Sequence, residues 1–438
     1  MAVPPPLPPP VPPRSGLSRN VWIIIVVGIA LALIVDLSAG IGGIVFLRKF
    51  VKQQTERNKP ENIIADRTRR IAKNPKDGQA YADRGRAWSG EGKYKEAVAD
   101  YTKAIELDPQ NHHLYIWRAY GRNCLGDYDG AIADATRAME LDPKAAAAYS
   151  NRGYARRYKG DADGAIADLD KAIELDPKSA YCYSTRAGAK SFKGDYAGAI
   201  ADYSHALTLT PKDPLLYVER GAAKKANGDL PGAISDYDRA IELDPKSSST
   251  YRRRGVTRRA AGDLSGSMAD FTRVIELEPK DGRTYGYRGT TQMLLHHWTE
   301  ALADYHHSFE LTGDDTGYAH LHAWMAGAQL GQTEAANAEL ATYLSQRKKS
   351  TSGDWISTAG GYLLDKVTEE DLFAAASKGS DKLQHNRQCQ AWCYAGMKRL
   401  LGGDTATAAE DFRKSVATEQ KTINEYLLAE AELKALAP

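Results

Sequence analysis

Apolar and polar positions recur along this chain with a period of 34 residues between Gly78 and Asp315. With small variations, each of seven repeats opens on Tyr-x-x-Arg-Gly and continues, after a Gly-Asp pair, with Ala, Ile and Tyr set among charged residues. The tyrosines at the openings are Tyr81, Tyr115, Tyr149, Tyr183, Tyr217, Tyr251 and Tyr285, and the prolines that close six repeats are Pro109, Pro143, Pro177, Pro211, Pro245 and Pro279. Such a period is typical of helix-turn-helix repeats.

Each repeat is expected to fold as two helices that approach closely at small residues. In the first repeat, Gly85 and Ala97 allow the close approach, while Tyr81 and Tyr101 fill the space beside it. The Gly-Asp pair ends the first helix and starts the second, and the closing Pro109 ends the second. No repeat can bury its apolar face alone, so the repeats must stack.

These positions resemble the pattern of the tetratricopeptide repeat (TPR) family, in which an aromatic residue, a small residue, Ala, an aromatic residue, Ala and Pro follow in that order. The matching residues of the first repeat are Tyr81, Gly85, Ala97, Tyr101, Ala104 and Pro109. The resemblance implies an all-α helix-turn-helix solenoid that coils as a right-handed superhelix. It also implies that the first helices line a concave groove for protein or peptide partners.

The pattern divides the chain into a proline-rich disordered tail (1–20), a transmembrane helix (21–47), a linker with a half-repeat (48–77), seven repeats (78–315) and a degenerate helical region (316–438). In the last region, the period is broken from Lys348 to Asn386. Residues 422–437 are expected to form a capping helix with one polar face.

The transmembrane prediction rests on Val21 to Leu47, 27 residues with a single charge, Asp36. A cleavable signal peptide is the alternative, but cleavage after Ala39 would place Leu37 where a small residue is preferred. An uncleaved anchor is therefore expected. A stripe at four-residue steps could join two such helices into a homodimer: Gly28, Ala32, Asp36 and Gly40.

Basic residues flank the apolar segment unequally. Two precede it (Arg14 and Arg19), and five follow it (Arg48, Lys49, Lys52, Arg57 and Lys59). Positive charge favours the cytoplasmic side, so the repeats are expected to face the cytoplasm from a single-pass anchor in a bacterial inner membrane.

Composition and motifs argue against other classes of function. The 58 basic and 56 acidic residues leave a formal net charge of +2, which gives no electrostatic basis for nucleic-acid binding. Neither a phosphate-binding glycine loop nor a nucleophile elbow is present, so neither catalysis nor a cofactor is expected. Six histidines do gather in a short stretch: His296, His297, His306, His307, His320 and His322. They leave open a metal-binding sensor or enzyme, although solvated or packing histidines are the simpler interpretation.

Arginine and aspartate recur in strict register with the repeat. The arginines are Arg84, Arg118, Arg152, Arg186, Arg220, Arg254 and Arg288, and the aspartates are Asp100, Asp134, Asp168, Asp202, Asp236, Asp270 and Asp304. Because these residues do not vary between repeats, they are expected to form structural pairs between helices.

Binding is instead expected where the first helices differ from repeat to repeat. The groove positions that the TPR resemblance implies carry an aromatic stretch, Trp117, Tyr120, Asn151, Tyr154 and Tyr181, and a basic stretch, Arg252, Arg253, Arg259 and Arg283. Together they predict a groove for an extended peptide or an acidic tail.

A second, looser resemblance concerns the last quarter of the chain. Segments such as Tyr318 to Trp324 and Cys389 to Tyr394 resemble the C-terminal region of bacterial NlpI-type TPR lipoproteins, envelope adaptors that recruit peptidases and murein hydrolases. The sequence therefore predicts a membrane-anchored, non-catalytic TPR scaffold, with an NlpI-type envelope adaptor as the alternative.

Overall fold

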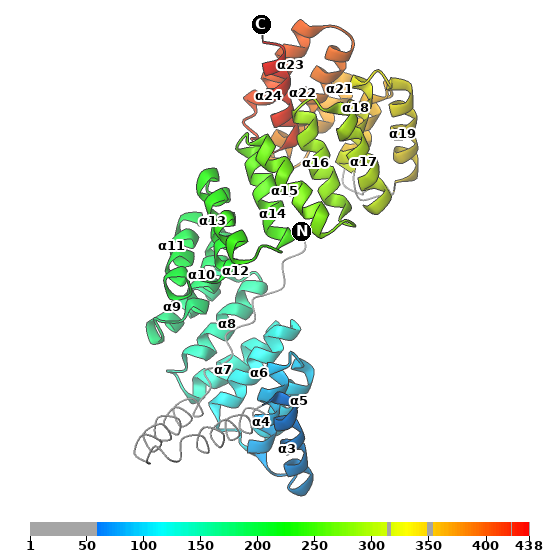
Figure 1. Cartoon of the computed structure of the whole chain (residues 1–438). Coiled ribbons are helices and arrows are strands. Elements are labelled where there is room, and N and C mark those ends of the chain that lie inside the picture. Colours follow the sequence, from blue (N-terminus) through cyan, green and yellow to red (C-terminus); the bar gives the residue numbers. More distant parts are fainter. Residues whose placement is uncertain (1–58, 313–316, 348–353, 422, 438) are drawn as a thin grey trace, which may run out of the picture. The chain divides into compact units, whose positions relative to one another are not determined.

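The computed structural model describes residues 59–312, 317–347, 354–421 and 423–437, and within them every regular element is an α-helix (Figure 1). The expected all-helical repeat solenoid is confirmed. The proline-rich tail and the expected transmembrane helix, with its dimer stripe, lie outside these residues. None of the helices that are described combines the length and apolarity needed to cross a bilayer.

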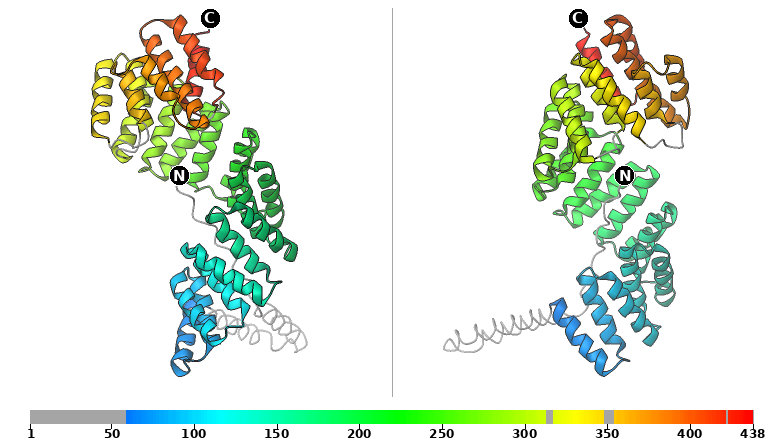
Figure 2. Two further views of the ribbon diagram at one scale, coloured as in Figure 1. Left: turned by 180° about the vertical axis from the view of Figure 1, so that it is seen from behind. Right: turned by 90° about the vertical axis from the view of Figure 1, so that its right-hand side faces the viewer.

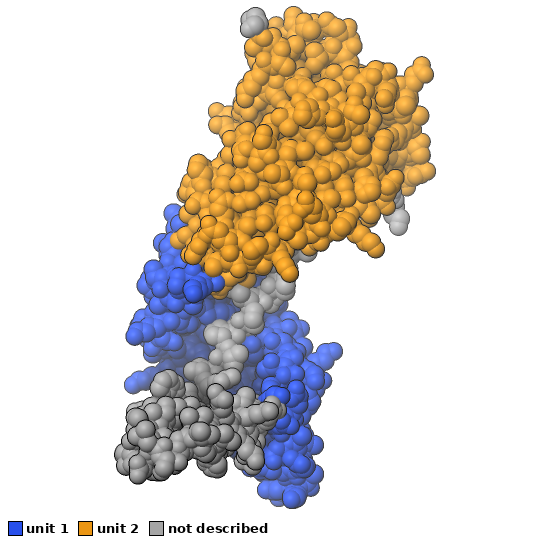
Figure 3. Space-filling model, in the orientation of Figure 1, with its two compact units in different colours: residues 1–212 blue, residues 213–438 orange. Residues whose placement is uncertain are grey.

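The chain divides into two compact units, unit 1 (residues 1–212) and unit 2 (residues 213–438) (Figure 3). Unit 1 contains α3 (Pro60–Lys73), α4 (Gly78–Gly90), α5 (Tyr94–Leu107), α6 (His112–Leu125), α7 (Tyr128–Leu141), α8 (Ala146–Tyr158), α9 (Ala162–Leu175), α10 (Ala180–Lys193) and α11 (Tyr196–Leu209). Unit 2 opens with α12 (Pro214–Ala226), α13 (Leu230–Leu243), α14 (Ser248–Ala260), α15 (Leu264–Leu277), α16 (Gly282–Leu294) and α17 (Trp298–Thr312). It closes with α18 (Gly317–Gln329), α19 (Thr333–Gln346), α20 (Trp355–Leu363), α21 (Glu369–Ala376), α22 (Asp381–Leu401), α23 (Thr405–Ala417) and α24 (Asn424–Ala435).

Each repeat is a pair of packed helices, as two further views show (Figure 2). The first helices are α4, α6, α8 and α10 in unit 1 and α12, α14 and α16 in unit 2; each is followed by its second helix. Helix α3 packs against α4 in the place that the second helix of a preceding repeat would take.

A Gly-Asp pair makes the turn between the two helices of most repeats. Gly126 ends α6 with φ 78°, a left-handed conformation that is readily available to glycine alone. Asp127 then caps α7 by accepting a hydrogen bond from the Gly130 amide over 3.0 Å. The same turn recurs at Gly160, Gly194, Gly228 and Gly262.

The expected close approach of the two helices is also present. A Cβ atom added to Gly85 on α4 would lie 2.7 Å from Cε1 of Tyr101 on α5, so only glycine fits against that ring. Ala97 and Tyr101 are almost completely buried at the same contact. The repeat thus uses one small residue and one aromatic ring as a matched pair.

The expected Arg–Asp pairs between helices are confirmed in all seven repeats. In the second repeat, Arg118 Nε and Nη2 donate to the two carboxylate oxygens of Asp134 over 2.9 and 2.7 Å. Arg118 Nη1 also donates to Thr102 on the second helix of the preceding repeat, over 3.1 Å. Arg122 adds a further ion pair to Asp134 at 2.8 Å. One arginine therefore ties together α5, α6 and α7.

The end of unit 2 departs from this regular frame. Where the sequence breaks the period, the short helices α20 and α21 pack into one core with α18, α22 and α23. The capping helix is present as α24, which packs on α22 and α23 and also contacts α16. Its buried side chains include two carboxylates, Glu425 and Glu432, at 2% and 3% exposure.

Candidate binding surfaces

The aromatic stretch of unit 1 lies on α6, α8 and α10, but its members are unequally accessible. Tyr120 and Tyr154 are 8% and 3% exposed. Trp117 and Tyr181 are half-buried, and the Tyr181 hydroxyl is shielded from solvent. The expectation that all of these rings face a ligand is therefore corrected: Tyr120 and Tyr154 pack between neighbouring helices.

Asn151, the polar member of that stretch, connects the backbones of two successive first helices. Its Nδ2 donates to the Ile116 carbonyl over 3.1 Å, and Asn123 Nδ2 donates to the Asn151 carbonyl over 3.0 Å. Both asparagines are buried. Asn151 is thus a packing residue, and its expected position on an open groove is corrected as well.

Trp117 is the member best placed to meet a partner. The Arg86 guanidinium carbon lies 4.9 Å from the Trp117 ring, and the His113 ring stacks on it at 5.8 Å with an interplanar angle of 16°. Burial, together with the charge of His112, lowers the pKa of His113, so that imidazole is mainly neutral at pH 7. An indole, an imidazole and a guanidinium therefore form a partly open platform in unit 1.

The four arginines of the basic stretch have different surroundings in unit 2. Arg252 Nη2 donates to Asp281 over 2.6 Å and its Nε donates to Thr284 over 3.1 Å, so it links α14 to α16. Arg283 is exposed at the start of α16, and Arg253 is half-buried. Arg252 is therefore already neutralised within the protein.

Arg259 is buried, at 5% exposure, and carries no carboxylate partner among the described residues. Its Nη1 donates to the Tyr287 carbonyl over 3.0 Å, and its guanidinium carbon lies 5.9 Å from the Phe271 ring and 6.0 Å from the Tyr287 ring. Burial lowers the pKa of Arg259 to about 10. The expected open, exposed position of this arginine is corrected.

Lys225 on α12 is a neighbour that sequence reasoning missed. Burial lowers its pKa, and the positive charges of Arg259 and Arg253 lower it further. The signal for it was present, because Lys225 precedes Arg259 by one repeat period and so occupies the same position of the first helix. Three cations thus share one region of unit 2.

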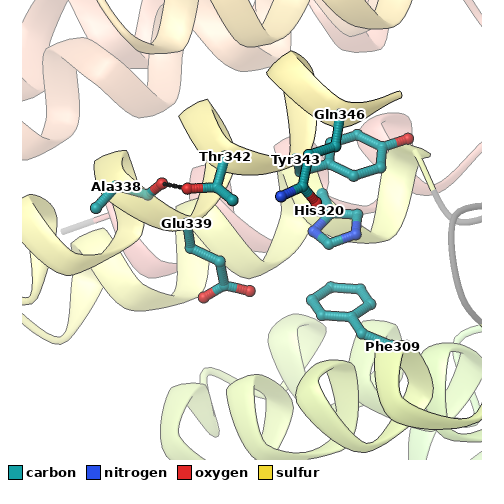
Figure 4. A pocket seen from close by; sticks show the side chains of 7 residues that line it. All are labelled: Phe309, His320, Ala338, Glu339, Thr342, Tyr343 and Gln346. Carbon is teal, nitrogen blue, oxygen red and sulfur yellow. Dashed lines mark hydrogen bonds between the residues drawn. The ribbon is translucent and has the colours of Figure 1, made fainter. Parts of the chain in front are cut away.

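The six histidines that lie close together in the sequence have different contacts in the structure. His306 Nε2 lies 3.0 Å from Glu339, and His322 Nε2 lies 3.3 Å from Glu425. The His320 ring is stacked between Phe309 and Tyr343, at centroid distances of 3.7 and 3.8 Å, in a shallow pocket (Figure 4). In the part of the chain that the structure describes, no three His, Cys, Asp or Glu side chains meet as a metal site would require.

The two buried carboxylates of α24 differ in their partners. Burial raises the pKa of Glu425, but the hydrogen bond from His322 and a 2.9 Å hydrogen bond from the Tyr394 hydroxyl outweigh it, and the pKa lies below its usual value. Burial alone raises the pKa of Glu432 to about 7. His296 Nδ1 lies 3.6 Å from Glu432, too far for a hydrogen bond, and burial lowers the pKa of His296.

Family models match the repeats in four places. A tetratricopeptide repeat model matches residues 78–111, a TPR repeat model matches 193–228, and a second tetratricopeptide repeat model matches 125–180 and 218–282. The chain is a TPR protein. The matched residues do not include the end of unit 2, and the resemblance of residues 316–438 to NlpI-type lipoproteins is not confirmed. No curated protein matches this TPR protein in sequence.

Solved structures with a similar fold include other TPR proteins. YrrB, described as a TPR protein with an unusual peptide-binding site, is 23% identical, with a TM-score of 0.38 over 43% of this chain and 96% of YrrB. A tetratricopeptide repeat protein from Parabacteroides merdae is 18% identical, with a TM-score of 0.44 over 56% of this chain and 98% of its own. PilW, a type IV pilus biogenesis factor, is also 18% identical, with a TM-score of 0.44 over 46% of this chain and 94% of PilW.

Proposed function

We propose that this TPR protein is a non-catalytic scaffold that holds protein or peptide partners against the first helices of its repeats and is tethered to a membrane by residues 21–47. TPR repeats are suited to protein–protein interaction, and TPR proteins are generally scaffolds without catalytic activity. The membrane tether rests on the apolar run from Val21 to Leu47.

One observation supports the binding role most strongly: the constant charges of the repeats are bonded inside the protein, whereas two of the variable positions, Trp117 and Arg253, are only half-buried. Every repeated arginine is bonded to the aspartate of its own repeat. The variable positions of the first helices place the half-buried Trp117 in unit 1 and the half-buried Arg253 in unit 2. Tryptophan and arginine are the residue types that most often carry binding energy at protein interfaces.

The binding role is tested by capturing partners with the immobilised full-length chain and measuring their affinities. Because a true anchoring aromatic contributes about 2 kcal/mol or more, Trp117→Ala should weaken a partner of unit 1 about 30-fold. Lys103→Ala is the control, since Lys103 is exposed on α5 and, within the described part of the chain, forms an ion pair with Glu106 alone, over 2.6 Å. If Trp117→Ala and Arg253→Ala both keep wild-type partners and affinities, the first-helix faces are not the binding surface.

The tether is tested separately on membranes. The full-length chain should stay in the membrane pellet after carbonate extraction, whereas a chain that begins at Lys59 should be released. Recovery of a mature protein that begins near Gly40 would show instead that the segment is a cleaved signal. A reporter fused after Pro438 then tells whether the repeats face the cytoplasm, as the basic residues behind the segment favour.

A further inference from the structure

Helix α24 lies on the first helices of the repeats that close unit 2. Helix α18 is followed by Gly331, with φ 74°, and by α19, and α22 is followed by Gly403, with φ 84°, and by α23. This order of helix, glycine turn and helix is that of the regular repeats, so α18 and α22 are first helices, as α16 is. Helix α24 packs on α22 and contacts α16 (Figure 1). A segment of the chain itself thus covers first helices at this end of unit 2.

The buried face of α24 carries two carboxylates beside apolar side chains. Glu425, Leu428, Ala429 and Glu432 recur at helical spacing, and each is at most 3% exposed. Leu428 and Ala429 belong to the same apolar core as side chains of α16, α18 and α22. The two carboxylates therefore lie in the contact between α24 and the first helices.

Glu425 supplies a carboxylate that the eighth repeat lacks. His322 lies one period after Arg288, and Ala338 lies one period after Asp304, so this repeat has no aspartate at the position that pairs in the others. His322 Nε2 lies 3.3 Å from Glu425 Oε1 instead. Glu425 thus joins α24 to α18 in the way that an aspartate joins the two helices of a regular repeat.

Glu432, two turns later on the same face, is not bonded in this way. Its Oε1 atom is shielded from solvent and has no hydrogen-bond partner in the described part of the chain. The ionisable groups that face it are His296, at 3.6 Å behind α16, and the buried Cys393 thiol on α22. On α24 itself, Glu430 accepts a hydrogen bond from Tyr426, and Lys434 is exposed.

No cation among the described residues neutralises Glu432 near pH 7. Burial and the charge of His297 lower the pKa of His296, and burial raises the pKa of Cys393, so both groups are mainly uncharged. On α23, the buried Asp411 is bonded to Arg399, and the other charged side chains are exposed. Glu432 therefore lies in the contact with its charge uncompensated whenever it is ionised.

From these contacts we infer that α24 is a pH-sensitive latch: it covers the first helices at the end of unit 2 while Glu432 is protonated, and it is released when Glu432 is ionised. A buried carboxylate without a counter-ion is costly, whereas release places it in water. Helix α24 belongs to no repeat pair, so its release leaves the pairs intact. The inference rests on the proposed binding role of the first helices and names the regulation of that role.

The direction of the pH response follows from the burial of Glu432. Burial raises its pKa from 4.5 to about 7 while α24 is in place, so the closed state binds the proton more tightly than the released state. The latch is therefore closed most firmly below pH 4.5, weakens as the pH rises to about 7, and stays weak above that pH.

Hydrogen exchange of the full-length chain, followed by mass spectrometry, measures the opening of α24. After correction for intrinsic exchange rates, the equilibrium constant for opening should rise about 25-fold from pH 5.5 to pH 8, the change that the two pKa values of Glu432 require. Glu432→Gln should abolish this rise. Glu430→Gln is the matched control, because it removes the same charge from the same helix, where Glu430 meets the Tyr426 hydroxyl at 3.3 Å, and it should keep the rise. Because His296 gives the opposite slope below pH 6.5, both variants are also compared in a His296→Gln background.

A second experiment asks whether another helix can take the place of α24. A fluorescein-labelled peptide of residues 423–437 that carries Glu432→Gln should bind the wild-type full-length chain. Its apparent affinity should rise by up to about 25-fold from pH 5.5 to pH 8, because the released state is more populated. The unaltered peptide should show almost no pH dependence, since ionisation weakens its own binding as much as that of α24. A scrambled peptide is the control. This experiment needs no variant of the chain, so it decides the question even if Glu432→Gln misfolds.

Three results would overturn the inference. Equal pH dependence of α24 exchange in wild type and Glu432→Gln would mean that this carboxyl does not control the opening. Exchange that rises equally in α22 and α24 would mean that the whole end of unit 2 loosens. Absence of binding of the Glu432→Gln peptide at pH 8 would mean that the face under α24 is not open to another helix. In each case partners of unit 1 that depend on Trp117 would be unaffected, so the wider scaffold proposal would stand or fall on its own test.

Discussion

The regular repeats and the end of unit 2 both bury acidic side chains, but they neutralise them differently. In the second repeat, Asp134 is 3% exposed and is met by two arginines, at 2.7 and 2.8 Å. In the capping helix, Glu432 is equally buried, and among the described residues the one ionisable partner within 4 Å is His296, at 3.6 Å. Glu425 lies between these cases, with one histidine and one tyrosine as partners.

This contrast separates structural charge from charge that can respond to its surroundings. In the repeats, the charge of Asp134 is matched by two arginines of α6, so this aspartate holds α6 and α7 together. A carboxylate or guanidinium that is buried without its counter-ion stores an unfavourable free energy, which a proton or a ligand can relieve. Glu432 and Arg259 are such groups, one acidic and one basic, and both lie in unit 2.

The largest expected effect is the removal of a fully bonded aspartate. Asp134→Ala would leave Arg118 and Arg122 partly buried without their carboxylate, and breaking a buried ion pair in this way costs about 3 to 5 kcal/mol. Denaturant unfolding of the full-length chain measures the loss. Asp129→Ala serves as the control, because Asp129 is 82% exposed in its pair with Lys159. A loss below about 1 kcal/mol for Asp134→Ala would mean that the Arg–Asp pairs do not hold the frame.

Most of the structure of the helix pairs could be predicted from the sequence because the same 34-residue pattern occurs seven times. Repetition shows which positions are constant, and the helix-turn-helix geometry then fixes what each must do: Gly85 faces the Tyr101 ring, Asp127 caps a helix, and Arg118 meets Asp134. The end of unit 2 offers no such repetition. His322 and Glu425 lie 103 residues apart in sequence, and no local sequence pattern predicts their contact.

The candidate site was predicted only in outline. The position of a residue within the repeat shows on which face of the helix it lies, but it does not show how deeply its side chain is buried. The positions of Trp117 and Tyr154 suggested a common exposed surface, yet Tyr154 is buried. How deeply a side chain is buried depends on the residues of the next repeat that pack against it. The Arg157 guanidinium, for example, packs where Gly188 leaves room: a Cβ at Gly188 would lie 2.3 Å from it.

The second largest effect should depend on pH. The pKa of Glu432 is raised from 4.5 to about 7 in the folded protein, so the folded state holds its proton more tightly than the unfolded state. Stability should therefore fall as the pH rises from about 4.5 to about 7, with a full penalty of about 3 kcal/mol above that range. Glu432→Gln, which keeps the shape without the charge, should stabilise the protein by about that amount at pH 8 and hardly at all at pH 4.5.

Two ionisable neighbours of Glu432 also affect the pH dependence of stability, and their contributions must be separated from that of Glu432. His296 has a lowered pKa and contributes the opposite slope below pH 6.5, and the buried Cys393 thiol on α22 also senses Glu432. Comparing Glu432→Gln in wild-type and His296→Gln backgrounds isolates the carboxylate. A gain in stability that is equal at pH 4.5 and pH 8 would show that packing, and not ionisation, distinguishes Glu432 from the repeat aspartates.

An intermediate loss of stability is expected when Glu425, a buried carboxylate with hydrogen-bond partners but no arginine, loses one of these partners. Tyr394→Phe removes the 2.9 Å hydrogen bond to Glu425 and leaves His322 as the remaining side-chain partner of that carboxylate among the described residues. A hydrogen bond to a charged group contributes about 1.5 to 3 kcal/mol, so stability at pH 7 should fall by about 2 kcal/mol. Tyr101→Phe is the matched control, since the one hydrogen-bond partner of the Tyr101 hydroxyl among the described residues is the neutral Ser89 hydroxyl, at 3.2 Å. Equal losses in the two variants would mean that the charge on Glu425 does not matter.

The smallest effect is expected for ion pairs that join neighbouring repeats at the surface. Lys159 and Asp129 form such a pair, with side chains 44% and 82% exposed, and Lys193 and Asp163 repeat it one period later. Exposed pairs contribute less than about 1 kcal/mol, because water already solvates both charges and salt screens them. A double-mutant cycle on Lys159→Ala and Asp129→Ala should give a coupling energy in that range that vanishes at high salt. The Arg118–Asp134 pair also joins a basic side chain to an aspartate, but both side chains are mostly buried, at 13% and 5% exposure, so its coupling should survive the same salt. Suppose instead that the two coupling energies decrease equally with added salt. Burial would then not distinguish the repeated Arg–Asp pairs from the surface ion pairs, and the contrast between structural and responsive charges in this protein would be wrong.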